Sequence, residues 1–185
     1  MAENKYKNEE YKSRIKGKRT IQYTAWSSMR QRCYDKKLHL KHPSYKNCYI
    51  CEEWLDFQIF AKWFDQNYIS GYQLDKDLLK YNNKLYSPST CSFVPQEINL
   101  ALLKPCTKRE LPLGVYKHHY TPNKYVSHIK ENKVSKYLGI FDSVEEAANC
   151  YEEAKKIQLI NLANKYKNTI NIKAYTALIN YNIKN

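Results

Sequence analysis

Glycine, histidine and long apolar runs are scarce in this chain, and each shortage excludes something. The 185 residues contain only four glycines and five histidines, and no histidine occurs between His42 and His118. No apolar run approaches the length of about 18 residues that a membrane-spanning helix needs, so we expect no membrane span. The sequence also contains no P-loop, dinucleotide-binding fingerprint or nucleophile elbow.

What the chain has in excess is positive charge. Lys and Arg number 31 against 18 Asp and Glu, which gives a formal charge of +13 and a pI near 9.3. This balance favours a polyanionic partner, although charge alone does not choose DNA over RNA. Hydrophobic residues make up 43%, enough for a folded core. The N-terminus has no hydrophobic segment typical of a signal peptide, so we expect a cytoplasmic protein whose six cysteines stay reduced.

The first half of the chain shows alternating helical and strand-like patterns. Residues 1–19 read as a basic, flexible arm that would lie on DNA phosphates, with DNA-binding cations at Lys12, Arg14, Lys16, Lys18 and Arg19. Apolar spacing predicts a helix from Thr20 to about Asp35 and a second helix from Glu52 to Tyr68. Residues 72–103 read as strand, loop, strand and helix, with Pro95 at the start of the helix. Prolines and cations then interrupt the pattern at 104–112, which we interpret as a linker.

The second half combines a basic strand region with an acidic helix. Residues 113–141 read as three short strands, and Val144 to Asn164 as a long amphipathic helix. The tail at 165–185 is basic, and Tyr175 and Leu178 indicate that it could continue as a helix. The whole chain is therefore predicted to be α+β, with a three-stranded antiparallel sheet packed on one helix in its second half.

The strand-and-helix unit resembles a known DNA-binding family. The texts GVYKHH, KYVSHIK and KYLGIFDSVEEAANCYEEA in residues 113–163 resemble the ethylene-response-factor (APETALA-type) domain. The resemblance implies that alternating strand side chains enter the major groove of DNA. Those side chains fall on Tyr116, His118, Tyr120, His128, Lys130, Ser135 and Tyr137, while Lys117, Lys124 and Lys136 would meet phosphates. The family has arginines and tryptophans at several of these places, so its sequence preference does not transfer.

We expect the tyrosines of these strands to face solvent. Alternate residues of a strand share one face, which would group Tyr116, His118 and Tyr120. The opposite, helix-facing side would be filled by apolar residues. These are Val115, Val126, Ile129, Leu138 and Ile140.

Residues 20–103 resemble the N-terminal part of phage HNH-type homing endonucleases. The matching texts are AWSSMRQRCY, CEEWLDFQIFAKWF and LDKDLLKYNNKLYSPSTCSFVPQEIN, and the last has the order of a ββα-metal finger with flanking helices. The family's catalytic positions would fall in Leu74–Asp77, near Ser89–Thr90 and at Asn99. The histidine that acts as general base is missing, while Asp75, Asp77 and Asn99 could still hold Mg²⁺. We therefore favour a finger kept as a DNA-binding scaffold.

Four cysteines raise the question of a structural zinc. Cys48 and Cys51 form a C-x-x-C, with Cys33 upstream and Cys91 in a predicted strand. Four thiolates could bind zinc, but the spacing lacks a clean second knuckle. Buried free cysteines are the alternative that we favour.

Together these patterns predict a sequence-specific double-stranded DNA-binding protein of phage or mobile-element type, acting in the bacterial host cytoplasm. It would derive from a homing endonuclease, lack strong nuclease activity and act as a transcriptional repressor. A palindromic operator would require a homodimer. One alternative is an active Mg²⁺-dependent endonuclease or nickase, and another is an inhibitor or scaffold that acts on a different nucleic-acid-binding protein.

Overall fold

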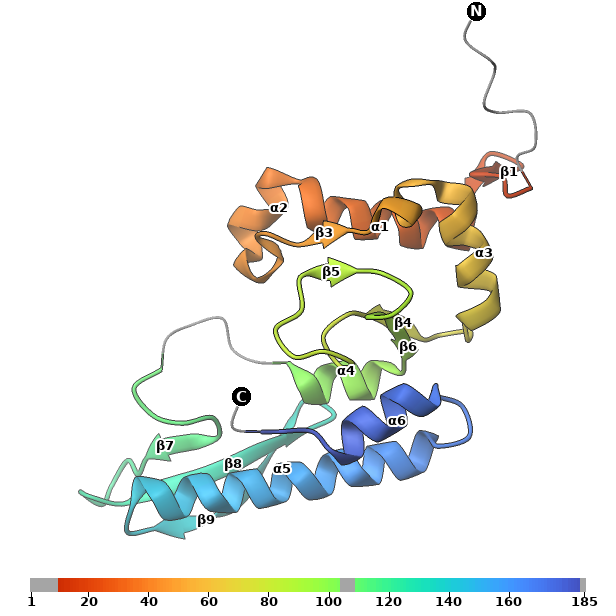
Figure 1. The fold of residues 1–185 in the computed structure, drawn as a ribbon. Helices are drawn as coiled ribbons and strands as arrows, with labels where there is room; N and C mark the ends of the chain where they lie inside the picture. The colour runs from red at the N-terminus through yellow and green to blue at the C-terminus, as the bar shows by residue number, and fades with distance from the viewer. Residues whose placement is uncertain (1–9, 104–108, 184–185) are drawn as a thin grey trace, which may run out of the picture. The chain divides into compact units, whose positions relative to one another are not determined.

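The computed structural model describes residues 10–103 and 109–183, and the chain is α+β as predicted (Figure 1). It divides into two compact units, Met1–Phe93 and Val94–Asn185. The boundary therefore lies before the helix that follows Pro95, and this helix belongs to the second unit. The sequence had predicted the boundary after that helix, at a linker spanning 104–112. Residues 1–9 of the predicted arm, 104–108 of the linker and 184–185 of the tail lie outside the described residues.

The first unit begins with a small hairpin and two helices. These elements are β1 (Arg14–Ile15), β2 (Lys18–Arg19), α1 (Ile21–Tyr34) and α2 (Lys36–Lys41). The described part of the predicted flexible arm is therefore an antiparallel hairpin. Thr20 ends the hairpin and caps α1, since its side chain accepts a hydrogen bond from the Tyr23 amide. Asp35 caps α2 in the same way.

Short strands and aromatic helices complete the first unit. They are η1 (Pro43–Tyr45), β3 (Tyr49–Ile50), η2 (Glu52–Leu55), α3 (Phe57–Asn67), β4 (Gln73–Asp75), β5 (Leu85–Tyr86) and β6 (Ser92–Val94). The single helix predicted from Glu52 to Tyr68 is wrong, because a 3₁₀ turn precedes α3. Asp56 separates the two by accepting a hydrogen bond from the Gln58 amide at 2.7 Å. β3 pairs with β5 in parallel, and β4 pairs with β6.

Aromatic side chains build the core of the first unit. Trp54 and Phe60 are fully buried, with ring centroids 5.1 Å apart and nearly perpendicular planes. Phe93 of β6 lies edge-on to Phe64 at 5.2 Å and stacks on Trp63 at 5.5 Å. Edge-to-face and offset geometries of this kind add to the burial energy of large rings. This core joins α3 to β6.

The second unit is a sheet with helices. Its elements are α4 (Gln96–Leu102), β7 (Val115–Lys117), β8 (Tyr125–Glu131), β9 (Val134–Phe141), α5 (Val144–Tyr166) and α6 (Ile172–Ile179). The strand order is β7-β8-β9 with antiparallel neighbours, and α5 packs on the sheet, which confirms the predicted architecture. Ser143 caps α5 by accepting from the Glu146 amide at 3.1 Å. The predicted continuation of the tail as a helix corresponds to α6, which packs on α5.

The two faces of this sheet differ from the expected division in one respect. Val115 and Ile129 are buried toward the helix as expected, at 0% and 2% exposure. Val126 and Ile140 were expected beside them, but they pair with each other, and Val126 pairs with Tyr116 on the other side. Directly opposite residues share a face, so Val126 and Ile140 lie on the open face with Tyr116. That part of the prediction is wrong.

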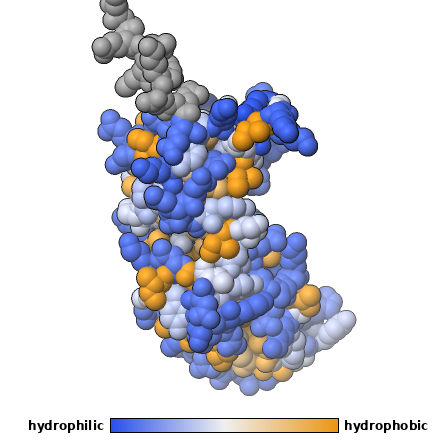
Figure 2. Space-filling model, turned by 90° about the vertical axis from the view of Figure 1, so that its right-hand side faces the viewer, coloured by the Kyte–Doolittle hydropathy of each residue, from blue (hydrophilic) through white to orange (hydrophobic). Residues whose placement is uncertain are grey.

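The face shown in the space-filling view is mostly polar (Figure 2). In the space-filling view, hydrophobic residues are interspersed among hydrophilic ones over the visible face (Figure 2). Among residues 10–103 and 109–183, no helix combines the length and apolar character needed to cross a membrane.

Candidate nucleic-acid interface

Three aromatic rings form a row across the open face of the second unit's sheet. His128 of β8 lies in the middle, edge-on to Tyr116 of β7 at 5.8 Å and to Tyr137 of β9 at 5.4 Å between ring centroids. Tyr116 is 42% exposed and Tyr137 is 56% exposed. Because the opposite face is covered by α5, this aromatic row (Tyr116, His128 and Tyr137) is the face left available to a partner.

The strand register explains why these rings meet. His128 is paired directly with Tyr137, and a shift in the ladder between Ser127 and His128 brings the two side chains opposite each other. The His128 amide donates to the Gly114 carbonyl at 2.8 Å, which joins β8 to the start of β7. The backbone pairing of β8 with β7 and with β9 therefore fixes the positions of the three rings on the open face.

Two cations lie beside the aromatic row, one at its Tyr116 end and one next to its middle ring. The Arg109 guanidinium lies 5.1 Å from the Tyr116 ring centroid and donates to the Val115 carbonyl at 3.1 Å. On the middle strand, Lys130 follows His128 by two residues on the same face; it is exposed and paired with Ser135 of β9. The sequence reading missed Arg109, although a cation just before a predicted strand was a usable signal. Arg109 and Lys130 place positive charge where a phosphate backbone would run beside the rings.

The other predicted lysines of the sheet are arranged less favourably. Lys117 pairs with Glu110 at 3.2 Å, and Lys124 pairs with Asp142. Lys136 is exposed, but the register places it opposite Ile129, on the helix-facing row. These three lysines are therefore not grouped with the aromatic row, in contrast to Lys130.

His118 and Tyr120 do not continue the first strand as the sequence predicted. β7 ends at Lys117, and the His118 ring accepts a hydrogen bond from the Thr121 amide at 3.0 Å. This bond closes a turn, which leaves Tyr120 at 86% exposure away from the strand. The expected grouping with Tyr116 on one strand face is wrong for both residues.

A hollow of about 630 Å³ adjoins the aromatic row within the second unit. Its lining includes Tyr116, His128 and Lys130 of the sheet and Lys155 of α5. Burial lowers the pKa of Lys155 to about 8, and its amine donates to Gln158 at 2.9 Å. Gln158 in turn donates to the Lys130 carbonyl at 2.8 Å. The helix thus holds the end of β8 that carries Lys130.

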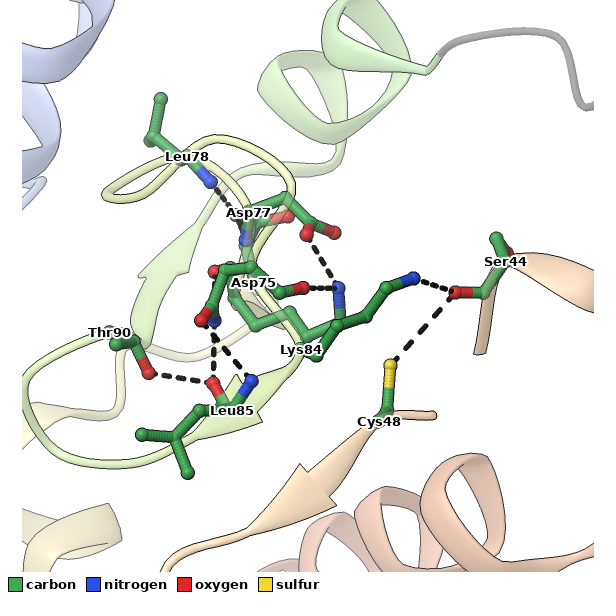
Figure 3. A network of polar contacts seen from close by, with 10 residues as sticks. Ser44, Cys48, Asp75, Asp77, Leu78, Lys84, Leu85 and Thr90 are labelled. Atoms are coloured by element: carbon green, nitrogen blue, oxygen red, sulfur yellow. Dashed lines mark hydrogen bonds and ion pairs between the residues drawn. The ribbon is translucent and has the colours of Figure 1, made fainter. Parts of the chain in front are cut away.

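In the first unit, the carboxylates of the finger-like segment are engaged by the chain itself (Figure 3). One oxygen of Asp75 accepts from the amides of Asp77 and Leu78 at 2.9 and 2.7 Å, which closes the turn after β4. Asp77 forms an ion pair with the buried Lys76, whose amine also donates to the Asn83 carbonyl at 2.8 Å. Both candidate metal ligands therefore already have structural roles.

The polar side chains near the predicted hairpin position also bind backbone. Asn83 is buried, and its amide donates to the carbonyls of Lys76 at 2.8 Å and Leu85 at 2.5 Å. The Thr90 hydroxyl donates to that same Leu85 carbonyl at 2.8 Å, and Ser89 bonds the Ser87 hydroxyl. These contacts hold the loop between β4 and β6. Asn99, the third expected ligand, lies half-buried on α4 of the second unit.

Asp75→Asn is expected to leave the stability of the first unit at pH 7 unchanged or raise it by up to about 1 kcal/mol, whereas Asp75→Ala should lower it by about 1–3 kcal/mol. Burial raises the pKa of Asp75 above its ordinary value. The folded state therefore favours the protonated acid, and the charged form costs stability increasingly as pH rises through the raised pKa. Asparagine keeps an oxygen that accepts from the Asp77 and Leu78 amides, and it removes the cost of burying a charge. Alanine leaves both amides without an acceptor.

Denaturant unfolding at pH 7 and at pH 3 measures both changes. The advantage of asparagine should shrink at pH 3, where the aspartate is protonated in both states. Loss of plasmid nicking in the asparagine variant, with Mg²⁺ or Mn²⁺ present and the fold intact, would instead assign Asp75 to metal chemistry.

The four candidate zinc ligands are free cysteines in or beside the aromatic core. Burial raises the pKa of Cys33 and Cys91 to about 12 each, and that of Cys48 is raised by the same cause. Within the described ranges, no three His, Cys, Asp or Glu side chains gather closely enough to hold a metal ion. The placement of these cysteines in or beside the aromatic core, away from any such cluster among the described residues, supports the core interpretation over the zinc site.

The finger-like segment thus binds its own backbone, while the open face of the sheet in the second unit presents the aromatic row with Arg109 and Lys130. No protein-family model, no curated protein and no solved structure matches this chain.

Proposed function

We propose that the protein binds double-stranded DNA sequence-specifically through the open face of its three-stranded sheet. The observation that carries this proposal is the aromatic row of Tyr116, His128 and Tyr137 on the open face, with Arg109 over Tyr116 and Lys130 next to His128 on β8. One face of the sheet packs on α5, so the partner would meet the other. The formal charge of +13 adds long-range attraction to a polyanion.

In this proposal the sheet enters a groove of the duplex, and the three rings read bases or sugars. Tyrosine hydroxyls and imidazole nitrogens can donate or accept hydrogen bonds at base edges. Arg109 and Lys130, beside the row, would bind phosphates and fix the register. Because the strands present Tyr, His and Ser at the reading positions, we expect a site that is not selected by bidentate arginine–guanine contacts.

A natural consequence of such binding is repression at an operator, without cleavage. Both carboxylates of the finger-like segment are committed to turn and ion-pair contacts, and no histidine occurs between His42 and His118 to serve as general base. We therefore propose binding rather than nuclease activity. The first unit would act as a scaffold that adds cationic surface.

The proposal is tested by selecting bound sequences from random duplex DNA with Mg²⁺ present, and by examining the recovered DNA for nicks. We expect an enriched motif on intact duplexes. Enrichment with nicks would support the nuclease alternative, to be followed by the Asp75 variants. Absence of any enriched motif would contradict sequence-specific binding and favour a protein partner for the open face.

A further inference from the structure

We propose a second DNA contact, in the first unit: the β1–β2 hairpin enters the minor groove, where Ile15 acts as a wedge that bends the duplex. This contact goes beyond groove reading by the sheet. It would make the protein a two-point binder, with one unit reading sequence and the other deforming the DNA.

The hairpin is strongly basic and fully exposed. Its cations are Lys12, Arg14, Lys16, Lys18 and Arg19. The sequence contains no acid from Lys12 to Tyr34, so nothing within that stretch neutralises them. All strand residues of the hairpin are exposed to solvent. This is the charge pattern expected for a contact with phosphates on both sides of a groove.

The hairpin is also held in place. At its base the Thr20 amide donates to the Ser13 carbonyl at 3.1 Å, and the Thr20 hydroxyl donates to the Lys12 carbonyl at 3.0 Å. Just before it, the backbone of Tyr11 exchanges two hydrogen bonds with the Gln58 side chain on α3, at 2.8 and 2.9 Å. A preorganised hairpin loses little conformational entropy on binding, unlike a flexible arm.

Its tip is narrow and is shaped by backbone conformation. Lys16 and Gly17 have φ values of 47° and 76°, as a two-residue hairpin turn requires. The Arg14 guanidinium donates to the Gly17 carbonyl at 2.9 Å, which closes the turn from the side. The strands are only two residues long, so the tip presents a single small edge.

Ile15 is the apolar residue of this basic tip, and it is not part of the hydrophobic core of the first unit. It is 58% exposed and lies opposite Lys18 in the hairpin. An apolar side chain surrounded by cations has no core to join there. Proteins that bind the minor groove use this combination, with cations on the phosphates and an apolar wedge between base steps that kinks the duplex.

An anionic membrane surface would also attract these cations, but the apolar surface of the hairpin is too small to anchor the protein in a membrane. Membrane-surface binding scales with the buried apolar area and is supplied by a whole helix face or by lipid chains. A single isoleucine can separate one base step, which is the size of contact that a wedge makes. We therefore assign the hairpin to duplex DNA.

The test is fluorescence energy transfer between dyes at the two ends of an AT-rich duplex of about 30 base pairs, at low salt, with the full chain. The unaltered protein should raise the transfer efficiency by bending the duplex. Ile15→Ala should remove at least half of that rise while the Kd changes less than about threefold, because the cations remain. Lys16→Gln with Lys18→Gln should reduce the salt slope of binding by about 2.

Leu40→Ala is the matched control, since Leu40 is an apolar residue of the first unit, on α2, and is 84% exposed. It should bend the duplex as the unaltered protein does. The wedge is overturned if Ile15→Ala bends the duplex as much as the unaltered protein does, or if neither protein bends it. It is also overturned if the protein binds phosphatidylserine vesicles in preference to the duplex. The sheet proposal is tested by a separate result. If His128→Ala selects the same DNA motif as the unaltered protein, the open face of the sheet does not read that motif, whatever the outcome for Ile15.

Discussion

Gly114→Ala is expected to lower the unfolding free energy of the second unit by about 2–5 kcal/mol, a large part of the total for a small domain. Gly114 has a φ of +77°, in the left-handed region that residues with a Cβ adopt at a cost. A Cβ at this position would lie 2.0 Å from the Cδ2 atom of Tyr151, an overlap that requires the ring or the backbone to move. The position matters because the Gly114 carbonyl accepts from the His128 amide and Val115 is fully buried.

Gly71→Ala separates the two causes. Gly71 has a similar φ of +82°, but no atom lies within 4 Å of its Cβ position, so only the backbone cost of about 1–2 kcal/mol applies. Tyr151→Ala in the Gly114→Ala background should recover part of the loss by removing the ring. Hydrogen exchange of α5 amides measures the second unit, while tryptophan fluorescence measures the first, since Trp26, Trp54 and Trp63 all belong to it. Equal losses for the two glycine variants would contradict the clash with Tyr151.

Periodicity predicted the α+β class and the sheet on one helix, because these depend on local alternation that the sequence shows directly. It failed where a side chain hydrogen bond ends an element. The first strand was extended through His118 and Tyr120, but the His118 ring accepts from the Thr121 amide and turns the chain. The helix from Glu52 was expected to be continuous, but Asp56 caps a new helix there. An aspartate before an apolar helical run was a signal that could have been used.

The division of the sheet faces could have been derived more closely. Val126 and Ile129 are an odd number of residues apart, so a regular strand cannot place both toward the helix. The structure buries Ile129 with Ser127 and turns Val126 outward. Hydrophobicity alone suggested the opposite for Val126. The shift between Ser127 and His128, which pairs His128 with Tyr137, falls beside Gly139, and an isolated glycine within a strand was a usable sign of a bulge.

The finger-like segment shows the limit of reading residue types without geometry. Asp75 and Asp77 have the chemistry of Mg²⁺ ligands, but in the folded chain Asp75 closes a turn and Asp77 pairs with Lys76. The same holds for the cysteines, whose burial within an aromatic core raises the pKa of Cys33 and Cys91. Arg109 was overlooked because it precedes the strand, although its guanidinium lies over Tyr116.

His128→Ala is expected to weaken binding to the selected site by about 10- to 100-fold, since it removes the middle of the aromatic row and about 1–3 kcal/mol of contact per base read. Its ring contacts both Tyr116 and Tyr137, so both neighbours lose their packing as well. Binding to unrelated duplexes, which depends on phosphates, should change little. Competition binding with the selected and scrambled sites measures the ratio.

Lys130→Ala should have the complementary signature, a similar loss on all sequences and a salt slope reduced by about 1. Tyr120→Ala serves as the matched control for the row, because Tyr120 is a tyrosine of the same unit, 86% exposed, but lies in the turn after β7. If Tyr120→Ala lost as much specificity as His128→Ala, the turn rather than the open face would make the reading contact. A protein that reads bases with its rings and phosphates with its cations must separate these two effects, because base contacts carry sequence information and phosphate contacts do not.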